Sequence, residues 1–436
     1  MSMTRPHVLL FLCDQMQYQR PGTIDPRAYT PHLDRLADEG SFFTHHYCAN
    51  AQCVPSRASL QTGRYPHEVG VMINDGFHEH TGRLTGEQTT VGQVFRDAGY
   101  TTAYFGKTHF GTSLERLGYD QGIAHDSRPP FAAGDRAIVE DAQAFLATQD
   151  PARPLFLTVS LQQPHPPLAL VGAFASRYPP DDLEVPPSYR QDDLVTKPPF
   201  QRAHAAGEHS YADADEATLL RELREYYTMI SAVDRLFGVV RAAGEARGMW
   251  DGAIVAFTSH HGDSDGRPPH APEGDATLRG TLPVPLVLRV PGQPLPRRVI
   301  DDLTVNVSLP GTLIEAAGLV SADFPGGSLF PALRRAAPPD DEMIFFEHYG
   351  AYWGLHPFRA ARTREWKYVR YYGPDQAGEL YDLRADPLEL RNLAGSADTL
   401  PVQTALDRAA ELWWSETGGR EFASYESPAF KARGLG

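Results

Sequence analysis

Cysteine is scarce in this chain. Its 436 residues include three cysteines, Cys13, Cys48 and Cys53, which are too few and of the wrong parity for a disulfide framework. Long apolar runs are also missing, because the first one ends at Cys13 and leads directly into Asp14. A signal peptide needs a longer apolar core, and a membrane span needs about 20 apolar residues. We therefore expect a soluble, cytoplasmic protein that makes no membrane contact.

Positive charge is in short supply as well. The chain has 40 Lys and Arg residues against 55 Asp and Glu residues, which gives a formal net charge of −15. Nucleic-acid binding requires a basic surface, so this balance argues against a nucleic-acid partner. A small anionic substrate is still compatible with it, because a local cluster of cations can reverse the field inside a cleft.

Short β-type runs that alternate with helical patterns are what the chain does contain. This alternation indicates an α/β sheet with helices on its faces. Thr30 is expected to cap a helix that Gly40 ends, and Thr90 to open another that ends near Gly99. We predict strands at residues 7–13, 101–105, 155–161 and 253–258, and a long helix at 214–248.

Residues of metal-binding or cationic type follow four of the predicted strands. In an open α/β sheet, ligands bind beyond the carboxyl ends of the strands, so these side chains are expected to gather at one edge. One such residue alone is more often a capping or surface group, whereas four strand ends together favour a site. The residues are Asp14, then Lys107 and His109, then His165, and finally His260 and His261.

A fifth element is the segment Cys53-Val-Pro-Ser-Arg57, which is followed by Thr-Gly-Arg at residues 62–64. Pro55 suits the start of a helix and Gly63 suits its end. Cys53 would then lie at a helix N-terminus, where backbone N–H groups favour anions and lower the pKa of a thiol. A buried structural cysteine is the alternative explanation for such a residue when it stands alone.

This segment resembles the sulfatase signature Cys-x-Pro-Ser-Arg followed by Thr-Gly-Arg. Because the similarity extends over nearly the whole chain, the protein resembles the formylglycine-dependent sulfatases of the alkaline phosphatase superfamily. The other matching segments are Asp14-Gln15, Thr30-Pro-His-Leu-Asp-Arg-Leu36, Gly106-Lys-Thr-His109, Pro164-His-Pro166, Thr258-Ser-His-His-Gly262, Arg362-Thr-Arg-Glu-Trp-Lys-Tyr368, and Glu379-Leu-Tyr-Asp-Leu383 with Asp386-Pro-Leu-Glu-Leu-Arg-Asn-Leu393.

The resemblance implies an alkaline-phosphatase-like α/β fold. Such a fold has a mixed, mostly parallel central sheet flanked by helices, and a smaller C-terminal antiparallel subdomain. Residues 320–340 contain Pro-Gly-Gly and Pro-Pro, which favour a boundary there. We therefore expect a catalytic domain at residues 1–335 and a subdomain with a small antiparallel sheet and a helix at 336–436. Residues 162–211, rich in Pro, Asp and His, are expected to form a long surface excursion.

The function implied by the resemblance is hydrolysis of a small anionic sulfate ester. In the family, a formylglycine-generating enzyme oxidises the motif cysteine, and the hydrate of the resulting aldehyde is the nucleophile of a two-step reaction. The resemblance assigns Cys53 to this position, Arg57 to holding the diol and Lys107 to binding the sulfate. It assigns His109 to the diol proton and His165 to protonation of the leaving alcohol, roles that suit groups titrating near neutral pH.

The implied metal shell departs from the family at one ligand. It consists of Asp14, modified Cys53, His260 and His261 around one divalent ion. The family carries Asp where His260 stands, so calcium, the ion of the family, competes here with zinc or manganese, which imidazole suits better. His260 is either a direct ligand or turned outward, and Asp263 or Asp265 could reach in instead. If His260 is a ligand, metal binding should weaken below about pH 6.5, because a protonated imidazole cannot coordinate.

A second departure concerns a lysine. The family has one shortly before the strand at Val284-Pro285, where Glu273 and Gly274 stand in this chain. Arg267 or Arg279 is a candidate replacement.

Two alternative functions share the same residues. A phosphonate monoester or phosphodiester hydrolase would use the same nucleophile and the same edge of the sheet. A degenerate homologue that binds an anion without turning it over is the non-enzymatic alternative. The alcohol part of the substrate depends on residues 113–135 and 162–211, and the sequence leaves both it and the oligomeric state open.

Overall fold

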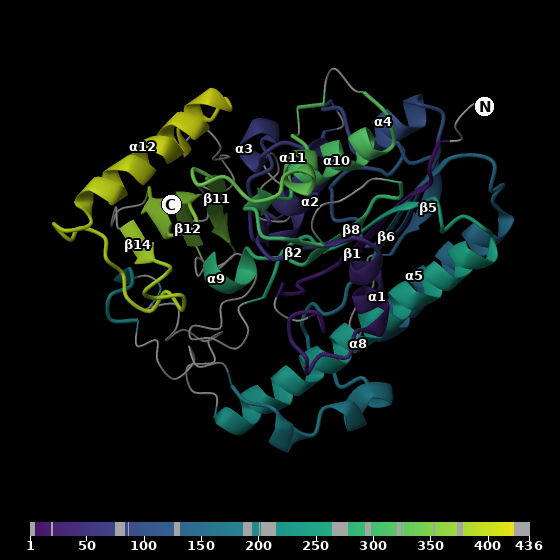
Figure 1. The fold of residues 1–436 in the computed structure, drawn as a ribbon, viewed down its shortest axis with the longest axis horizontal. Helices are drawn as coiled ribbons and strands as arrows, with labels where there is room; N and C mark the ends of the chain where they lie inside the picture. The colour runs from purple at the N-terminus through teal and green to yellow at the C-terminus, as the bar shows by residue number, and fades with distance from the viewer. Residues whose placement is uncertain are drawn as a thin grey trace.

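An eight-stranded sheet forms the centre of the computed structural model (Figure 1). Its strand order is β5-β4-β6-β1-β7-β8-β2-β9. The pairs from β5 to β7 are parallel, whereas β8 runs antiparallel to both β7 and β2. The mixed, mostly parallel sheet expected from the sequence is therefore confirmed.

The structure describes residues 5–18, 21–74, 83–85, 87–125, 131–185, 194–199, 201, 215–263, 278–292, 298–320, 324–325, 327–351, 354–372 and 378–422. The strands of the large sheet are β1 Val8–Cys13, β2 Ser41–Phe43, β4 Thr101–Gly106, β5 Gln121–Ala124, β6 Leu155–Ser160, β7 Ile254–Ser259, β8 Leu286–Arg289 and β9 Val299–Ile300. Strands β3 His46–Tyr47 and β10 Thr304–Val305 pair with each other.

Helices cover both faces of the sheet (Figure 1). In the central strand β1, Leu10 packs among residues of α2, α4 and α10, and its neighbour Phe11 among residues of α1, α5 and α8. Burial on both faces explains why this strand reads as a continuous apolar run. The helices are α1 Pro31–Glu39, α2 Cys53–Thr62, α3 Pro66–Val69, α4 Val91–Asp97, α5 Phe131–Thr148, α8 Glu216–Ala246, α9 Leu278–Thr281, α10 Ser308–Ala316, α11 Phe330–Arg334 and α12 Leu400–Glu416, with short 3₁₀ turns at Gly172–Arg177 and Pro180–Asp182.

The start of α1 differs from the expectation. Thr30 precedes the helix but makes no side-chain capping bond. Its hydroxyl instead accepts from the backbone of Gly22 at 2.6 Å. The backbone N–H groups of His32 and Leu33 donate to the buried carboxylate of Asp234 on α8. A tertiary contact thus replaces the local cap, which a sequence pattern cannot reveal. At α4 the expected cap is confirmed, because the Thr90 side chain accepts from the backbone of Gln93.

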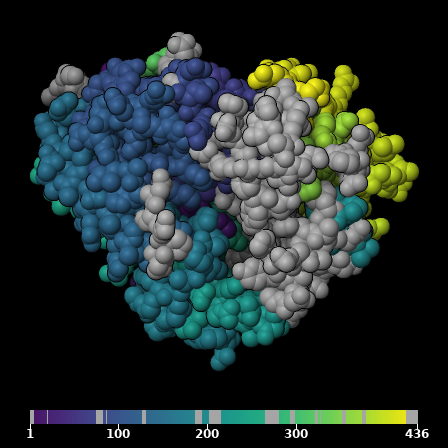
Figure 2. Space-filling view, turned by 180° about the vertical axis from the view of Figure 1, so that it is seen from behind, coloured from purple at the N-terminus to yellow at the C-terminus, as the bar shows by residue number. Residues whose placement is uncertain are grey.

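A four-stranded antiparallel sheet follows the large sheet along the chain, as expected. Its order is β11-β12-β13-β14, and α12 packs on it. The strands are β11 Ile344–Ala351, β12 Gly354–Arg362, β13 Trp366–Tyr371 and β14 Gly378–Asp382. Seen from behind, in Figure 2, the yellow C-terminal residues lie at the upper right of the molecule and most of the blue surface lies at the left. The exact boundary at residue 335 stays a prediction; it falls between α11 and β11.

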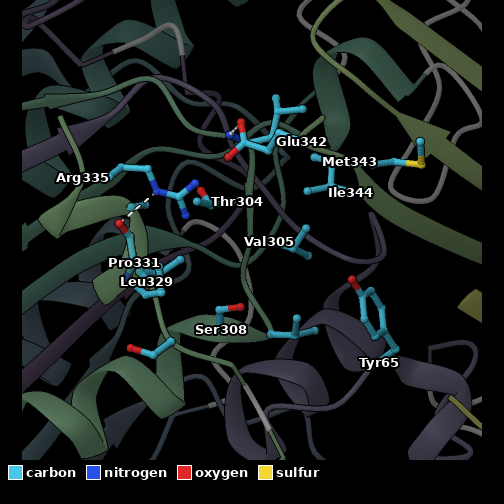
Figure 3. Close-up of a pocket in the computed structure, with 14 residues that line it drawn as sticks. Tyr65, Thr304, Val305, Ser308, Leu329, Pro331, Arg335, Glu342, Met343 and Ile344 are labelled. Atoms are coloured by element: carbon cyan, nitrogen blue, oxygen red, sulfur yellow. Dashed lines mark hydrogen bonds between the residues drawn. The ribbon is translucent and has the colours of Figure 1, made fainter. Parts of the chain in front are cut away.

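A pocket of about 240 Å³ lies where this sheet meets the rest of the fold (Figure 3). Its walls come from β10, from the segment around α11 and from the start of β11, and include Thr304, Leu329, Arg335 and Ile344. Tyr65, which follows α2, completes the wall. The junction between the two sheets is therefore not completely filled.

No helix among the described residues is long and apolar enough to cross a membrane.

Candidate active site

The four strands that carry the predicted site residues are neighbours in the sheet. Their order is β4, β6, β1, β7, all parallel, with Gly106 opposite Ser160 and Cys13 opposite Ser259. Asp14, Lys107 and His260 each follow the last residue of a strand in this group. The structure therefore brings them to one edge, at the carboxyl ends of the strands.

Cys53 is the first residue of α2, and its side chain is fully buried. Its Sγ lies 3.2 Å from His260 Nε2 and 3.4 Å from His261 Nε2. Lys107 Nζ is 3.4 Å away and Asp14 Oδ1 is 3.8 Å away. Every predicted metal ligand therefore meets at this one sulfur atom.

Asp14 is buried among positive neighbours. Lys107 Nζ donates to its Oδ2 at 2.5 Å, and Arg57 lies 3.8 Å from the same oxygen. Burial alone would raise the pKa of Asp14, but Lys107 and the other positive groups of the site more than offset it and hold the pKa well below its usual range. The carboxylate is therefore ionised, as a metal ligand must be.

The two adjacent histidines each turn one ring nitrogen toward the backbone. His260 Nδ1 lies 3.1 Å from the carbonyl oxygen of Cys13, and His261 Nδ1 lies 2.9 Å from that of Gly262. A carbonyl only accepts, so each Nδ1 carries the proton and each Nε2 presents its lone pair to the cluster. Burial, followed by Arg57, lowers the pKa of His260 well below its ordinary value although Asp14 opposes this. This shift favours the neutral imidazole, which is the form that can coordinate a metal ion.

One atom from each of Asp14, Cys53, His260 and His261 lies within 4.8 Å of the others. These are the four residues predicted to hold the ion. One carboxylate, two imidazole nitrogens and a buried atom at position 53 form a donor set that fits a divalent cation. Of the two predicted orientations of His260, the inward one is observed, with Nε2 3.1 Å from Asp14 Oδ1. Asp263 instead accepts from Gln15 at 2.6 Å, while Asp265, Arg267, Glu273, Gly274 and the Arg279 side chain lie outside the described residues.

Arg57 and Lys107 provide the positive charge of the site. Arg57 is almost completely buried, and its Nη1 donates to Ser160 Oγ at 2.9 Å and to the Lys107 carbonyl at 3.0 Å. Gly106 brings this strand end into close contact, since a Cβ there would lie 1.9 Å from the Ser160 carbonyl oxygen. Two fixed cations surround one carboxylate, so the site carries an excess positive charge suited to an oxyanion.

His109 and His165 lie in the loops beside this cluster. His109 is half-buried in the loop after β4 and has a left-handed backbone, with φ of 48°, a conformation that is uncommon for residues other than glycine. His165 is half-buried, and its Nδ1 lies 2.5 Å from the carbonyl oxygen of Pro166. Both predicted histidines thus flank the predicted metal ligands.

Asp135 is a residue of this site that the sequence analysis missed. It lies near the start of α5 and is fully buried. Its carboxylate accepts from the backbone N–H groups of Gln162 and Gln163, and from the Gln163 side chain. The backbone N–H of Asp14 donates to the Gln163 carbonyl. The backbone N–H of His165 donates to the Gln162 carbonyl. Asp135 thus ties the loop that carries His165 to the metal ligand. An acid on the apolar side of a predicted helix is the signal that could have revealed it.

Ser56 and Asn306 form a second unanticipated link. The Ser56 hydroxyl donates to the carbonyl of His260 and accepts from Asn306 Nδ2 at 2.9 Å. Asn306 Oδ1 also accepts from the backbone of Ala49. These bonds hold α2, which starts with Cys53, against the segment that carries the two histidines.

Comparisons with known proteins agree with this geometry. A sequence model described as Sulfatase matches residues 6–319, and one described as N-sulphoglucosamine sulphohydrolase, C-terminal, matches residues 278–413. The ulvan-active sulfatase of Formosa agariphila is 28% identical over 97% of this chain and 83% of that protein.

Solved structures share the fold. One, a complex with its substrate D-glucosamine-2-N,6-O-disulfate, superposes with a TM-score of 0.81 at 21% identity, covering 95% of this chain and 98% of the other. The phosphonate monoester hydrolase of Agrobacterium radiobacter gives a TM-score of 0.78 at 22% identity, covering 95% and 96%. At these identities the structural likeness concerns the fold alone.

Proposed function

The chain belongs to the sulfatase family of sulfuric ester hydrolases, and we propose that it cleaves its sulfate ester with a formylglycine made from Cys53 and one bound divalent ion. The observation that carries this proposal is the convergence of Asp14, His260, His261 and two fixed cations on the Cys53 side chain. A degenerate anion-binding homologue would not need this complete set.

The four residues of the predicted metal shell would hold the ion, which would supply Lewis-acid activation at position 53. The Cys53 Sγ occupies the place where the formylglycine oxygens would stand. Arg57 is held from two strand ends, so its guanidinium donates to these oxygens without losing its charge. Lys107 reaches both Asp14 and Cys53 and would bind the sulfate oxygens, where negative charge builds up in the transition state.

Proton transfer falls to the two flanking histidines. His165 keeps its Nδ1 proton toward Pro166, which leaves Nε2 as the atom that donates to the leaving alcohol when the ring is protonated. His109, in the neighbouring loop, would take the proton of the diol so that sulfate is expelled. A formylglycine-generating enzyme is the partner that maturation requires. The ulvan-active relative supports a sulfated saccharide as the substrate class.

The test is a side-by-side measurement of kcat/KM on an aryl sulfate and an aryl phosphodiester, with Cys53→Ala as the control variant. The mass of the peptide that contains Cys53 shows whether this residue is modified. We expect a preference for the sulfate, modification at Cys53, and a loss of at least about a thousandfold in Cys53→Ala. A higher kcat/KM on the phosphodiester would favour the phosphonate-type alternative instead. Turnover of the aryl sulfate by Cys53→Ala at the wild-type rate would rule out the mechanism.

A further inference from the structure

A second pocket lies between the catalytic body and the C-terminal sheet, with a volume of about 300 Å³. The body contributes residues from the loop after β1, from β3 and from the segment after α9, and the C-terminal part contributes β11, β12, β13 and the segment after β14. In Figure 1, α9 lies beside the strands of the C-terminal sheet. The lining residues are Tyr18, His45, Tyr47, Pro283, Phe346, Arg362, Arg364, Lys367, Leu383, Pro387 and Glu389.

Cations dominate the wall of this pocket. Lys367 donates to the Glu389 carboxylate, and Arg364 bonds to the Asp301 carbonyl and to Glu342. Arg362, the last residue of β12, differs from these two lining cations. Among the described residues, no carboxylate lies within 4.0 Å of it. Its Nε is buried and has no hydrogen-bond partner in the described part of the chain. Arg362 is therefore the cation of this wall that no close carboxylate among the described residues balances, and an anionic occupant would balance it.

The positive charge of this wall contributes to the lowered pKa values of two neighbouring groups. Burial, followed by Arg362 and Arg364, lowers the pKa of His45 to about 4. Burial lowers the pKa of Lys367 to about 8 and Arg362 contributes, although Glu389 opposes both effects. Arg362 also lies over the ring of Tyr47, 5.2 Å from the ring centroid. In a chain with a net charge of −15, this local excess of positive charge is a distinct feature.

The pocket shares its walls with the segments of the active site. Tyr18 is four residues beyond Asp14, so the two Cα atoms are at most about 14 Å apart. Pro283 is two residues beyond Thr281, whose carbonyl accepts from the backbone of Gly262 at 2.7 Å, next to His261. The pocket therefore lies within the length of one extended substrate from the metal ligands.

We propose that the pocket around Arg362 binds a second acidic group, a carboxylate or another sulfate, on the same saccharide whose sulfate ester is cleaved. This proposal rests on the proposed function and narrows its substrate class to polyanionic saccharides. Arg362 would face that group as an unbalanced cation of the pocket wall, and the short chain distance to the metal ligands favours a group on the substrate over a separate ligand.

The test compares two substrates that differ in one charge: a sulfated disaccharide with a uronic acid, and the same disaccharide with that carboxyl reduced to the alcohol. The wild-type enzyme is expected to prefer the acid by about tenfold in kcat/KM, because hydrogen bonds to charged groups have this order of strength. Arg362→Gln should lose the preference and keep its turnover of 4-nitrophenyl sulfate. Arg370→Gln removes a cation from β13 that pairs with Asp407 outside the pocket, and it should retain the preference.

Loss of folding is separated from loss of recognition by Arg362→Lys, which keeps the charge and should keep part of the preference. A wild-type enzyme without a preference, or an Arg362→Gln variant that retains it, overturns the proposal. A free anion is tested with glucuronate added to the 4-nitrophenyl sulfate assay. A change in rate that disappears in Arg362→Gln would assign the pocket to a separate ligand and overturn the substrate assignment.

Calorimetric binding of the two disaccharides to the wild-type protein and Arg362→Gln decides the question without turnover. If no sulfate ester is hydrolysed, the proposed function fails, yet tighter binding of the acid that depends on Arg362 still supports the pocket. Equal binding of both disaccharides overturns it.

Discussion

Two buried polar clusters of this protein use the same kinds of residue for different ends. At the edge of the large sheet, Arg57 and Lys107 surround the single carboxylate of Asp14. In the C-terminal sheet, Lys197 and Lys367 meet two carboxylates. Lys367 donates to Glu389, and the Tyr371 and Tyr381 hydroxyls and Gln201 Nε2 donate to Glu379.

The difference lies in charge balance and in position. The C-terminal cluster has as many carboxylates as lysines, and Lys197 donates within it to the Tyr381 hydroxyl and the Glu389 carbonyl. It therefore joins Lys197 and Gln201 to the sheet, and its own charges balance. The cluster at the strand ends has two cations, Arg57 and Lys107, for one carboxylate, and its possible ligand atoms lie close together. Excess charge at the carboxyl end of a parallel sheet indicates chemistry, whereas balanced charge on a sheet face indicates structure.

The largest expected contrast comes from removing one lysine from each cluster. Lys107→Ala should lower kcat/KM on an aryl sulfate by about a hundredfold to a thousandfold, because it removes charge from the transition state. Lys367→Ala should lower the free energy of unfolding by about 3–5 kcal/mol, since it leaves Glu389 buried without its partner. Steady-state kinetics and chemical denaturation of both variants measure the contrast. Equal losses of stability, or a larger kinetic loss in Lys367→Ala, would break the distinction.

His165→Ala should lose about a hundredfold in kcat on alkyl sulfates, whose alcohols leave poorly without a proton. Activated aryl sulfates should be affected far less, because their leaving group needs no acid. The measurement is a series of sulfate esters with leaving groups of increasing pKa. An equal loss across the series would assign His165 to binding.

His260→Asp should shift the metal preference toward calcium, because it exchanges an imidazole for hard oxygen donors. Metal content, and activity in calcium and manganese side by side, give the result. In the wild-type protein, the low pKa of His260 predicts that acidification to about pH 6 does not protonate this ligand. Unchanged metal content and rate in the variant would show that position 260 is not part of the site.

The smallest effect concerns two buried aspartates that each accept from two backbone N–H groups. Asp135→Asn should widen the gap in rate between aryl and alkyl sulfates by about tenfold, because it loosens the loop of His165 and alkyl sulfates depend most on that acid. Asp234→Asn, which loosens only the start of α1, should leave this gap unchanged. If both variants change it alike, Asp135 has no positioning role.

The same pair predicts a dependence of stability on pH. Burial raises the pKa of Asp234 to about 7 and that of Asp135 to about 6. A raised carboxyl pKa means that the folded state favours the protonated form, so its stabilising contribution is complete below about pH 4 and is lost as the pH rises through the folded value. The melting temperature of the wild-type protein minus that of Asp234→Asn should therefore be more positive at pH 5 than at pH 8.

Local patterns in the sequence determined the alternation of strands and helices, the residues at the strand ends and the family signature that includes Cys53. These features follow from periodicity and from short motifs, which neighbouring residues encode. The cytoplasmic location and the catalytic role of each residue stay predictions. The sequence pattern could not show that β4, β6, β1 and β7 are neighbours, because the order of strands depends on which faces pack together.

Only the tertiary structure decided how the site is held and what surrounds it. The inward orientation of His260 depends on the carbonyl of Cys13, which lies 247 residues away in sequence. The capping of α1 by Asp234, the hold of Asp135 on residues 162–163 and the pocket around Arg362 all join segments distant in the chain. Contacts of this kind arise from the packing of whole elements, so no local sequence pattern predicts them. They set the charge and the geometry on which the chemistry depends.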